Sequence, residues 1–232
     1  MPVRALVVGA GGLGGPIAIA LGGAGIQLTI VDPDTVELSN LHRQIQFTAA
    51  DIGHPKATRL AGRVVGLGGQ ARAVVGRFTA ATADTLAADA DLVVDGTDDP
   101  ATKFAVADWA VASGRHYVIA GALRYGGNVM AGAPGVACYR CLFEEPELAG
   151  PTCADAGVLG PVVGAIGGVA AAVAIGRVRG ERGLAGALLA FDDLRVVSDP
   201  RIGRFAARRD CPACARAPIS PFASPVRVAG TP

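Results

Sequence analysis

The residues best suited to chemistry lie near the start of the chain, where a glycine-rich turn follows the apolar run Val3–Val8. The turn reads Gly9-Ala10-Gly11-Gly12-Leu13-Gly14. Gly9 would make the tight turn, Gly11 would let the backbone approach a phosphate, and Gly14 would let the next helix pack on the strand. The free N–H groups at the start of that helix would attract the phosphate. The pattern predicts a nucleotide-binding loop.

The context of this turn matters, because a chain with 33 glycines can contain such a pattern by chance. The turn lies between a predicted buried strand and a predicted helix. A second predicted strand, residues 28–32, ends in Asp32, and an acid at this position typically bonds a ribose hydroxyl. A glycine-rich turn that binds no nucleotide is the alternative.

A second polar group follows Asp32. Asn40, Arg43 and Gln44 lie in a polar segment, and Lys56 stands at the start of a predicted helix. Two cations and two amides near a phosphate loop suit a triphosphate better than NAD, because the cations can stabilise the charge on a departing pyrophosphate. Asp98, just after the third central strand, is a natural Mg²⁺ ligand. Singly, each residue reads as an ordinary surface or helix-start residue; together they predict a site for ATP and Mg²⁺.

The cysteines suggest a metal site. Four of the five form two Cys-x-x-Cys pairs, Cys138/Cys141 and Cys211/Cys214. Two such pairs suit one tetrahedral Zn²⁺, and a pair of redox dithiols is the alternative. The long separation means that zinc would join the C-terminal region to the middle of the chain. Cys153 is left over in a polar loop, 144–155, either as an accessible reactive thiol or as a plain loop cysteine.

The elements that position these residues alternate along the chain. Strands are predicted at 3–8, 28–32, 72–77, 91–94 and 117–120. Helices are predicted after the glycine turn and at 55–66, 82–88 and 101–113. This alternation predicts an α/β fold with a Rossmann-like, doubly wound, mostly parallel sheet. After Gly126, short runs at 128–131 and 136–137 and a last hairpin of 188–191 with 194–197 predict an antiparallel extension.

Composition limits the organisation and the partners. The length and a hydrophobic content of 51% predict one domain over residues 1–214, and a proline-rich stretch without periodicity, 215–232, predicts a disordered tail. A net charge of +1, without a basic stripe, predicts no nucleic-acid partner. The start shows no signal peptide, which favours a cytoplasmic location.

One uncharged segment, 156–176, has about the length of a membrane span. It is built from Gly, Ala and Val and has no flanking aromatic residues, which disfavours a transmembrane helix. We expect a helix at 161–179 that is buried on all sides, at a subunit interface, and no membrane partner.

Together these residues resemble the ThiF/MoeB/HesA family, the ubiquitin-activating-type adenylyltransferases of sulfur-carrier proteins. The resemblance covers residues 3–214. Pro161-Val162-Val163-Gly164 and the presence of Cys153 favour the thiamine-type ThiF side. The motifs that carry the resemblance are Gly9-Ala10-Gly11-Gly12-Leu13-Gly14, Asp32, Ser39-Asn40-Leu41-His42-Arg43-Gln44, Pro55-Lys56-Ala57, Asp95-Gly96-Thr97-Asp98, Cys138-Tyr139-Arg140-Cys141, Ala156-Gly157-Val158 and Cys211-Pro212-Ala213-Cys214.

The resemblance implies a homodimer that binds Mg·ATP and adenylates the C-terminal Gly-Gly carboxylate of a small ubiquitin-like sulfur carrier. Pyrophosphate would leave, and a cysteine desulfurase or rhodanese could donate the sulfur for a thiamine- or molybdopterin-type pathway. Carried over by position, the glycine turn with Leu13 binds phosphate, Asp32 the ribose and Asp98 the Mg²⁺, whereas Cys153 takes part in sulfur transfer. The triphosphate ligands would be Asn40, Arg43, Gln44 and Lys56.

The sequence departs from the family pattern in two places. Family members usually carry, before the first strand, a helix with an arginine that reaches the partner subunit's ATP, whereas the sequence here begins at the strand. Asp99 stands where asparagine is usual and would add a carboxylate beside the metal. Two other functions stay open: a nicotinamide-dependent dehydrogenase, for which His42, His54 and His116 are the only histidines, and a non-catalytic scaffold that binds the carrier.

Overall fold

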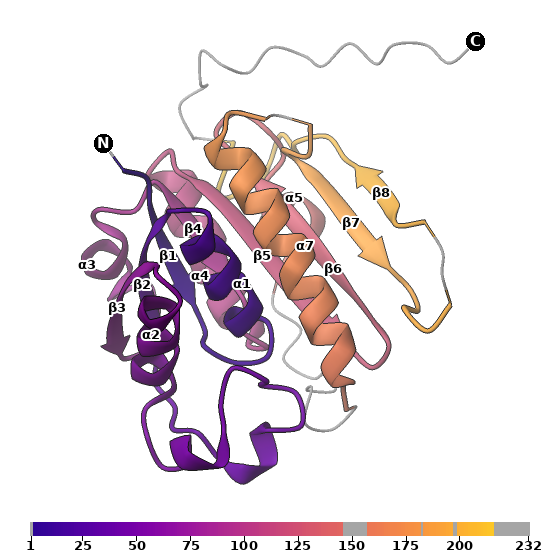
Figure 1. Ribbon diagram of the computed structural model, residues 1–232. Coiled ribbons are helices and arrows are strands. Elements are labelled where there is room, and N and C mark those ends of the chain that lie inside the picture. Colours follow the sequence, from indigo (N-terminus) through magenta and orange to yellow (C-terminus); the bar gives the residue numbers. More distant parts are fainter. Residues whose placement is uncertain (1, 146–156, 182, 197–198, 216–232) are drawn as a thin grey trace.

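The computed structural model describes residues 2–145, 157–181, 183–196 and 199–215. It contains one sheet of eight strands in the order β3-β2-β1-β4-β5-β6-β7-β8 (Figure 1). The first five strands in this order run parallel, and the pairings from β5 to β8 are antiparallel. The strands are β1 (Arg4–Val8), β2 (Gln27–Asp32), β3 (Gln70–Val75), β4 (Leu92–Asp95), β5 (His116–Leu123), β6 (Gly126–Gly132), β7 (Ala187–Phe191) and β8 (Arg201–Arg204).

Helices cover both faces of the sheet, which confirms the predicted doubly wound α/β fold with an antiparallel extension. In Figure 1, α1 (Gly14–Gly23), α2 (Lys56–Gly66) and α7 (Gly160–Val178) lie in front of the sheet. The opposite face carries α3 (Ala83–Ala87), α4 (Pro100–Ala112) and α5 (Tyr139–Leu142). Two short 3₁₀ helices, η1 (Leu38–Asn40) and η2 (Ala49–Asp51), lie in the segment after β2.

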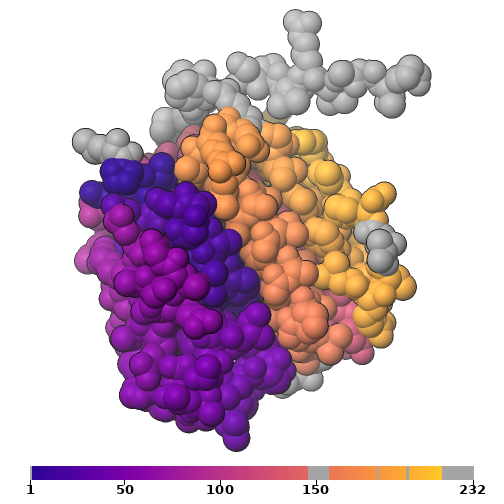
Figure 2. Space-filling view, viewed as in Figure 1, coloured from indigo at the N-terminus to yellow at the C-terminus, as the bar shows by residue number. Residues whose placement is uncertain are grey.

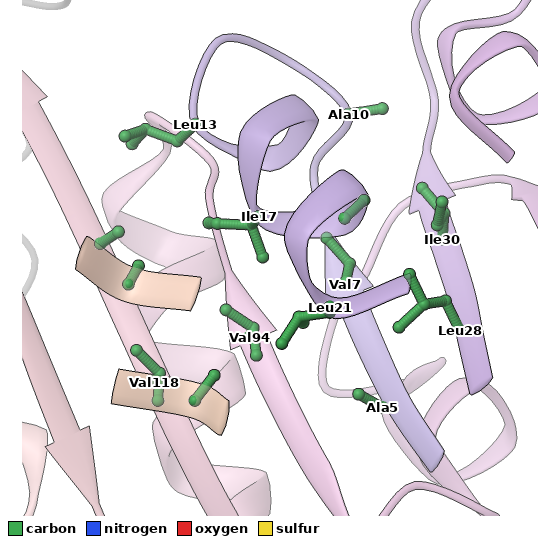
Figure 3. Close-up of a cluster of buried hydrophobic side chains, with 14 of the residues drawn as sticks. Ala5, Val7, Ala10, Leu13, Ile17, Leu21, Leu28, Ile30, Val94 and Val118 are labelled. Atoms are coloured by element: carbon green, nitrogen blue, oxygen red, sulfur yellow. The ribbon is translucent and has the colours of Figure 1, made fainter. Parts of the chain in front are cut away.

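The central strands read as continuous apolar runs because both of their faces are buried. Along β1, Val7 packs into the cluster beneath α1, and Leu6 packs into the cluster beneath α4; both side chains are fully buried. Ile17 and Leu21 of α1 lie over these strands in Figure 3. This packing holds the start of α1, and with it the glycine turn, directly above the end of β1.

The antiparallel extension differs in detail from the expectation. The predicted strand at 136–137 is wrong, because Val136 lies in a bend and Ala137 in irregular structure. The second strand of the last hairpin is β8, not the predicted 194–197. There, Asp193 accepts a hydrogen bond from the Arg195 N–H (2.9 Å), and the Leu194 N–H bonds the Tyr125 carbonyl (2.8 Å), so residues 194–196 form a turn.

Helix α7 leaves one face exposed in this one chain, so the expected burial of that face at a subunit interface stays a prediction. Its inner face packs on α1, β5 and β6, whereas Pro161, Ala165, Gly168 and Ala172 are exposed. Figure 2 shows this outer face at the surface, in orange. An almost wholly apolar helix has no polar stripe in its sequence that would mark the exposed side. By length and composition alone α7 could cross a membrane, a test that the core helix of a soluble protein also passes.

At the amino-terminal end of β5, a histidine and an arginine form a contact that is sensitive to pH. Arg177 of α7 contacts the Nδ1 atom of His116 at 3.1 Å. Burial, and secondly the Arg177 charge, lower the pKa of His116 below its usual 6.5. The unfolded chain therefore binds more protons between the lowered pKa and 6.5, so protonation of this site opposes folding.

We expect the free energy of unfolding to be undiminished by this group above pH 6.5 and to fall as the pH drops through 6.5 toward the lowered pKa of His116. Urea unfolding from pH 7.5 to 5.0 measures this slope. His116→Gln should flatten it, whereas His54→Gln, at an exposed position, should leave it as in the wild type. Equal slopes for the wild type and His116→Gln would contradict the assignment.

Candidate functional site

The carboxyl ends of the parallel strands open into a cleft of about 1220 Å³. Ligands of open α/β sheets bind at this edge, where the loops after neighbouring strands diverge. Three segments far apart in sequence meet there: the glycine turn after β1, the polar segment after β2 and the loop after β4. The ends of β5, β6 and β7 extend the cleft sideways.

The glycine turn has the geometry that its sequence predicts. Gly9 has φ +91°, a conformation that favours glycine. A Cβ on Gly14 would lie 1.9 Å from the Gly9 carbonyl oxygen, so only glycine lets α1 begin so close to the turn. Gly9, Gly11, Gly12 and Leu13 line the cleft. Gly14 lies behind this lining and serves the packing of the helix.

Asp32 holds the glycine turn from the side of β2. Its Oδ2 atom accepts a hydrogen bond from the Ala10 N–H at 2.6 Å, and its Oδ1 atom accepts one from the Asp34 N–H at 2.8 Å. Burial raises the pKa of Asp32, and the two N–H donors and the Lys56 charge oppose that rise. Asp32 also lines the cleft, so a ribose contact stays a prediction beside this observed structural contact.

The predicted triphosphate ligands lie together in the cleft lining: Asn40, Arg43, Gln44 and Lys56. Lys56 begins α2 and is buried, with its Nζ atom 3.0 Å from Asp34. Arg43 bonds the Ser39 carbonyl at 3.2 Å, and the buried Oε1 atom of Gln44 has no hydrogen-bond partner in the described part of the chain.

Gln46 is a residue that sequence reasoning missed. Its Nε2 atom donates to the Ala10 and Gly11 carbonyl oxygens, both at 2.9 Å, and the side chain is buried. It lies in the same polar segment as the predicted ligands Arg43 and Gln44. No signal in a single sequence marks a glutamine whose partners are backbone carbonyls 36 and 35 residues away.

The two neighbouring aspartates after β4 have different surroundings. Asp98 is exposed and lines the cleft, as a magnesium ligand would. Asp99 caps α4: its carboxylate accepts from the Ala101 and Thr102 N–H groups at 3.3 and 3.0 Å and from the Thr102 hydroxyl at 2.6 Å. The expected extra carboxylate for the metal is therefore engaged by the helix, as an acid directly before the helix-starting Pro100 could have indicated.

A buried ion pair, also missed from the sequence, holds the loop that carries Asp98. The Nζ atom of Lys103 donates to Asp95 and to the Thr97 and Ala120 carbonyls, each at 2.7 Å. The other Asp95 oxygen accepts from the Thr97 N–H and hydroxyl. Burial raises the pKa of Asp95, and Lys103 opposes that rise. The pair joins the end of β4 to the middle of β5, and Lys103 also lines the cleft.

The four predicted zinc ligands lie together, although each cysteine of the first pair contacts a cysteine 73 residues further along the chain. The four Sγ atoms of Cys138, Cys141, Cys211 and Cys214 all lie within 4.8 Å of one another, and the hydrogen-bonded pairs are 3.4 to 3.8 Å apart. A tetrahedral Zn²⁺ with bonds of about 2.3 Å needs sulfurs about 3.8 Å apart. One compact cluster favours a single metal over two separate dithiols.

Surrounding contacts hold this cluster against α4 and β5. Arg140 forms a bidentate ion pair with Asp108 (2.7 and 2.8 Å), and the Tyr117 hydroxyl accepts from the Tyr139 N–H at 2.8 Å. The Arg208 N–H points at the Cys141 sulfur at 3.4 Å, as donors around metal-bound thiolates do. Burial raises the pKa of Cys138, an effect that a bound cation would oppose.

Two predictions concern residues outside the described ranges. Cys153 lies within 146–156, and all of the predicted tail except Ala215 lies within 216–232. Both stay predictions.

The comparisons with known proteins agree with this architecture. The sequence matches the ThiF family over residues 2–213. The chain belongs to the ThiF family. It is 39% identical over 186 residues to the "Adenylyltransferase and sulfurtransferase uba4" of Emericella nidulans, which covers 74% of this chain and 39% of the relative. It is 38% identical over 200 residues to "Adenylyltransferase and sulfurtransferase MOCS3" of Dictyostelium discoideum, covering 83% and 47%. This ThiF-family chain spans less than half the length of these relatives.

Solved structures share the fold of this ThiF-family chain. MccB of E. coli, in a structure with ATP, superposes with a TM-score of 0.78 over 92% of this chain and 67% of that one, at 18% identity. MccB in complex with N-formylated MccA superposes with a TM-score of 0.79 over 91% of this chain and 67% of that one, also at 18% identity. At such identity the likeness concerns the fold.

We expect Lys103→Met to lower the free energy of unfolding by about 3–5 kcal/mol, because it leaves Asp95 buried without its charged partner. Urea unfolding at pH 7 measures the loss. The double variant Asp95→Asn/Lys103→Met should lose less than Lys103→Met alone, since it also removes the orphaned charge. An unchanged stability of Lys103→Met would contradict the role of this ion pair.

The purified protein should contain about one zinc per chain, measured by mass spectrometry of the metal content. Cys211→Ser should remove most of that zinc and lower the melting temperature, because the metal joins the C-terminal residues to the rest of the chain. Cys153→Ser is the matched control and should keep its zinc. Zinc content unaffected by Cys211→Ser would rule out the cluster as the site.

Proposed function

We propose that the protein is an ATP-dependent adenylyltransferase that activates the C-terminal carboxylate of a small ubiquitin-like sulfur carrier. One observation carries the proposal: the glycine turn, Arg43, Lys56 and Asp98 line a single cleft. Two relatives bear adenylyltransferase and sulfurtransferase in their names, which agrees with it. The reaction would join the carboxylate to the α-phosphate of ATP and release pyrophosphate.

The charges in the cleft suit this reaction. The Arg43 guanidinium and the Lys56 ammonium would face the phosphates that leave, and preorganised cations stabilise charge that builds up on a leaving group. Lys56 is held in place by Asp34, so little ordering would be needed on binding. Asp98, exposed beside the turn, would hold Mg²⁺, which would neutralise part of the triphosphate charge.

The part of the cleft that β5, β6 and β7 line suits the extended C-terminal end of another protein chain. Gly121 of β5, Asn128 of β6 and Ala190 of β7 are cross-strand neighbours in one row and line this part of the cleft. Two small residues flank the Asn128 carboxamide, which has no hydrogen-bond partner in the described part of the chain. A carboxamide can donate to and accept from a peptide group, and a Gly-Gly end would need no room for side chains. This shape supports a Gly-Gly acceptor.

Further parts of the proposal rest on family membership. A homodimer could form through the exposed small residues of α7, and a desulfurase or rhodanese could supply sulfur that reaches Cys153. Either a thiamine-type or a molybdopterin-type pathway, in the cytoplasm, would agree with the chain. A dehydrogenase is disfavoured, because the described cleft lining contains no histidine to act as acid or base.

The test is ATP–pyrophosphate exchange in the presence of a purified ubiquitin-like carrier that ends in Gly-Gly. Arg43→Ala and Lys56→Ala should each lower the exchange rate by about 10²–10³-fold, because each removes a charge that stabilises the departing pyrophosphate. Arg63→Ala, an exposed arginine of α2, is the matched control.

Wild-type exchange that depends on the carrier, together with loss in both cleft variants, would support the proposed function. Absence of exchange with every Gly-Gly carrier tried would overturn it. ATP binding without exchange would instead favour the carrier-binding scaffold.

A further inference from the structure

Two side chains, Asp32 and Gln46, hold the glycine turn, and their combined geometry determines where its N–H groups point. The Ala10 N–H donates to Asp32, and the Ala10 and Gly11 carbonyls both accept from the Gln46 carboxamide. A trans peptide is planar, with its C=O and N–H on opposite sides. When Gln46 draws the two carbonyls to one side, the Gly11 and Gly12 N–H groups therefore turn to the other.

The other side is the cleft. Gly11 and Gly12 line it, and Gln46 does not. Neither the Gly11 nor the Gly12 N–H has a hydrogen-bond partner within the described residues. Two adjacent unpaired N–H groups at the start of a helix form a concave donor site for an anion.

We propose that Gln46 is a positioning residue for the phosphates of the nucleotide: it fixes the two peptide planes whose N–H groups bind them. This inference rests on the proposed nucleotide site but not on the acyl transfer. Gln46 would act only through the backbone, since it does not itself reach the cleft.

The space around Gln46 supports a role that depends on shape. A Cβ on Gly15 would lie 2.3 Å from the Gln46 carboxamide, so α1 begins with a glycine where this side chain passes. The Gln46 Oε1 atom is buried without a partner in the described part of the chain. Within the described residues, the carboxamide oxygen thus has no hydrogen bond, while the carboxamide nitrogen binds two carbonyl oxygens. Its neighbour Ile45 is exposed and takes no part.

The proposal predicts that Gln46 affects the affinity for the phosphates but not the affinity for the rest of the nucleotide. Gln46→Leu removes both hydrogen bonds and lets the two peptides rotate. We expect the loss of these two neutral hydrogen bonds to lower the affinity for phosphates roughly tenfold. Adenosine has no phosphate, and its affinity should change less than twofold.

Gln46→Glu gives a second, opposite test of the same atoms. A carboxylate facing two carbonyl oxygens repels them and favours rotation of the peptides, which would present carbonyls to the phosphate. We expect a loss of ATP affinity larger than that of Gln46→Leu at pH 8. The loss relative to the wild type should shrink toward pH 5.5, because a protonated carboxyl can donate to one carbonyl.

The experiment measures binding of a non-hydrolysable ATP analogue with Mg²⁺ by calorimetry, and of adenosine by ligand-observed NMR. Wild type, Gln46→Leu, Gln46→Glu and the control Ile45→Ala are compared, and Ile45→Ala should bind as the wild type does. Weakened ATP binding with unchanged adenosine binding supports the proposal.

An equal loss of affinity for the ATP analogue and for adenosine would show that Gln46 has only a structural role, and would overturn the proposal. Unchanged binding of the ATP analogue in both Gln46 variants would overturn it too. Wild type that fails to bind the ATP analogue would overturn it as well. Wild type that binds the analogue but shows no pyrophosphate exchange would count only against the proposed function, so the two failures are distinguishable.

Discussion

The orientation of two peptide planes in the glycine turn is the constraint on which the site depends. Backbone N–H groups can bind a phosphate only if they are unpaired and face the cleft, and a flexible turn would satisfy them in other ways. Here Asp32 accepts a hydrogen bond from the Ala10 N–H, and Gln46 donates to two carbonyl oxygens. The Gly11 and Gly12 N–H groups have no partner among the described residues. The close approach of Gly14 to Gly9 leaves the turn little room to relax.

The change from parallel to antiparallel pairing after β5 gives the cleft its second arm. A parallel sheet alone would offer the nucleotide edge, whereas β6 and β7 bring a row of small residues and a carboxamide beside it. Lys103 bonds groups on β4, on the loop after β4 and on β5. The cysteine cluster holds the chain that follows β8 against α5. The proposed nucleotide and acceptor surfaces thus lie on one sheet.

Local patterns in the sequence were enough for the strand–helix alternation, the glycine turn and the cysteine pairs, because each depends on residues close together or on chemistry with few alternatives. These patterns did not predict the features that depend on contacts between residues far apart in the chain. Gln46 and Lys103 bond atoms that become neighbours only in the fold. Residues 194–196 form a turn because Asp193 bonds the Arg195 backbone and Tyr125 accepts from Leu194, which apolar spacing alone does not predict.

The most direct test of this account is a crystal structure of the protein with Mg²⁺ and a non-hydrolysable ATP analogue. The account predicts phosphate oxygens within hydrogen-bond distance of the Gly11 and Gly12 N–H groups, with Arg43 and Lys56 directed at the outer phosphates. A nucleotide bound elsewhere, or a bound triphosphate that leaves both N–H groups unpaired, would contradict it.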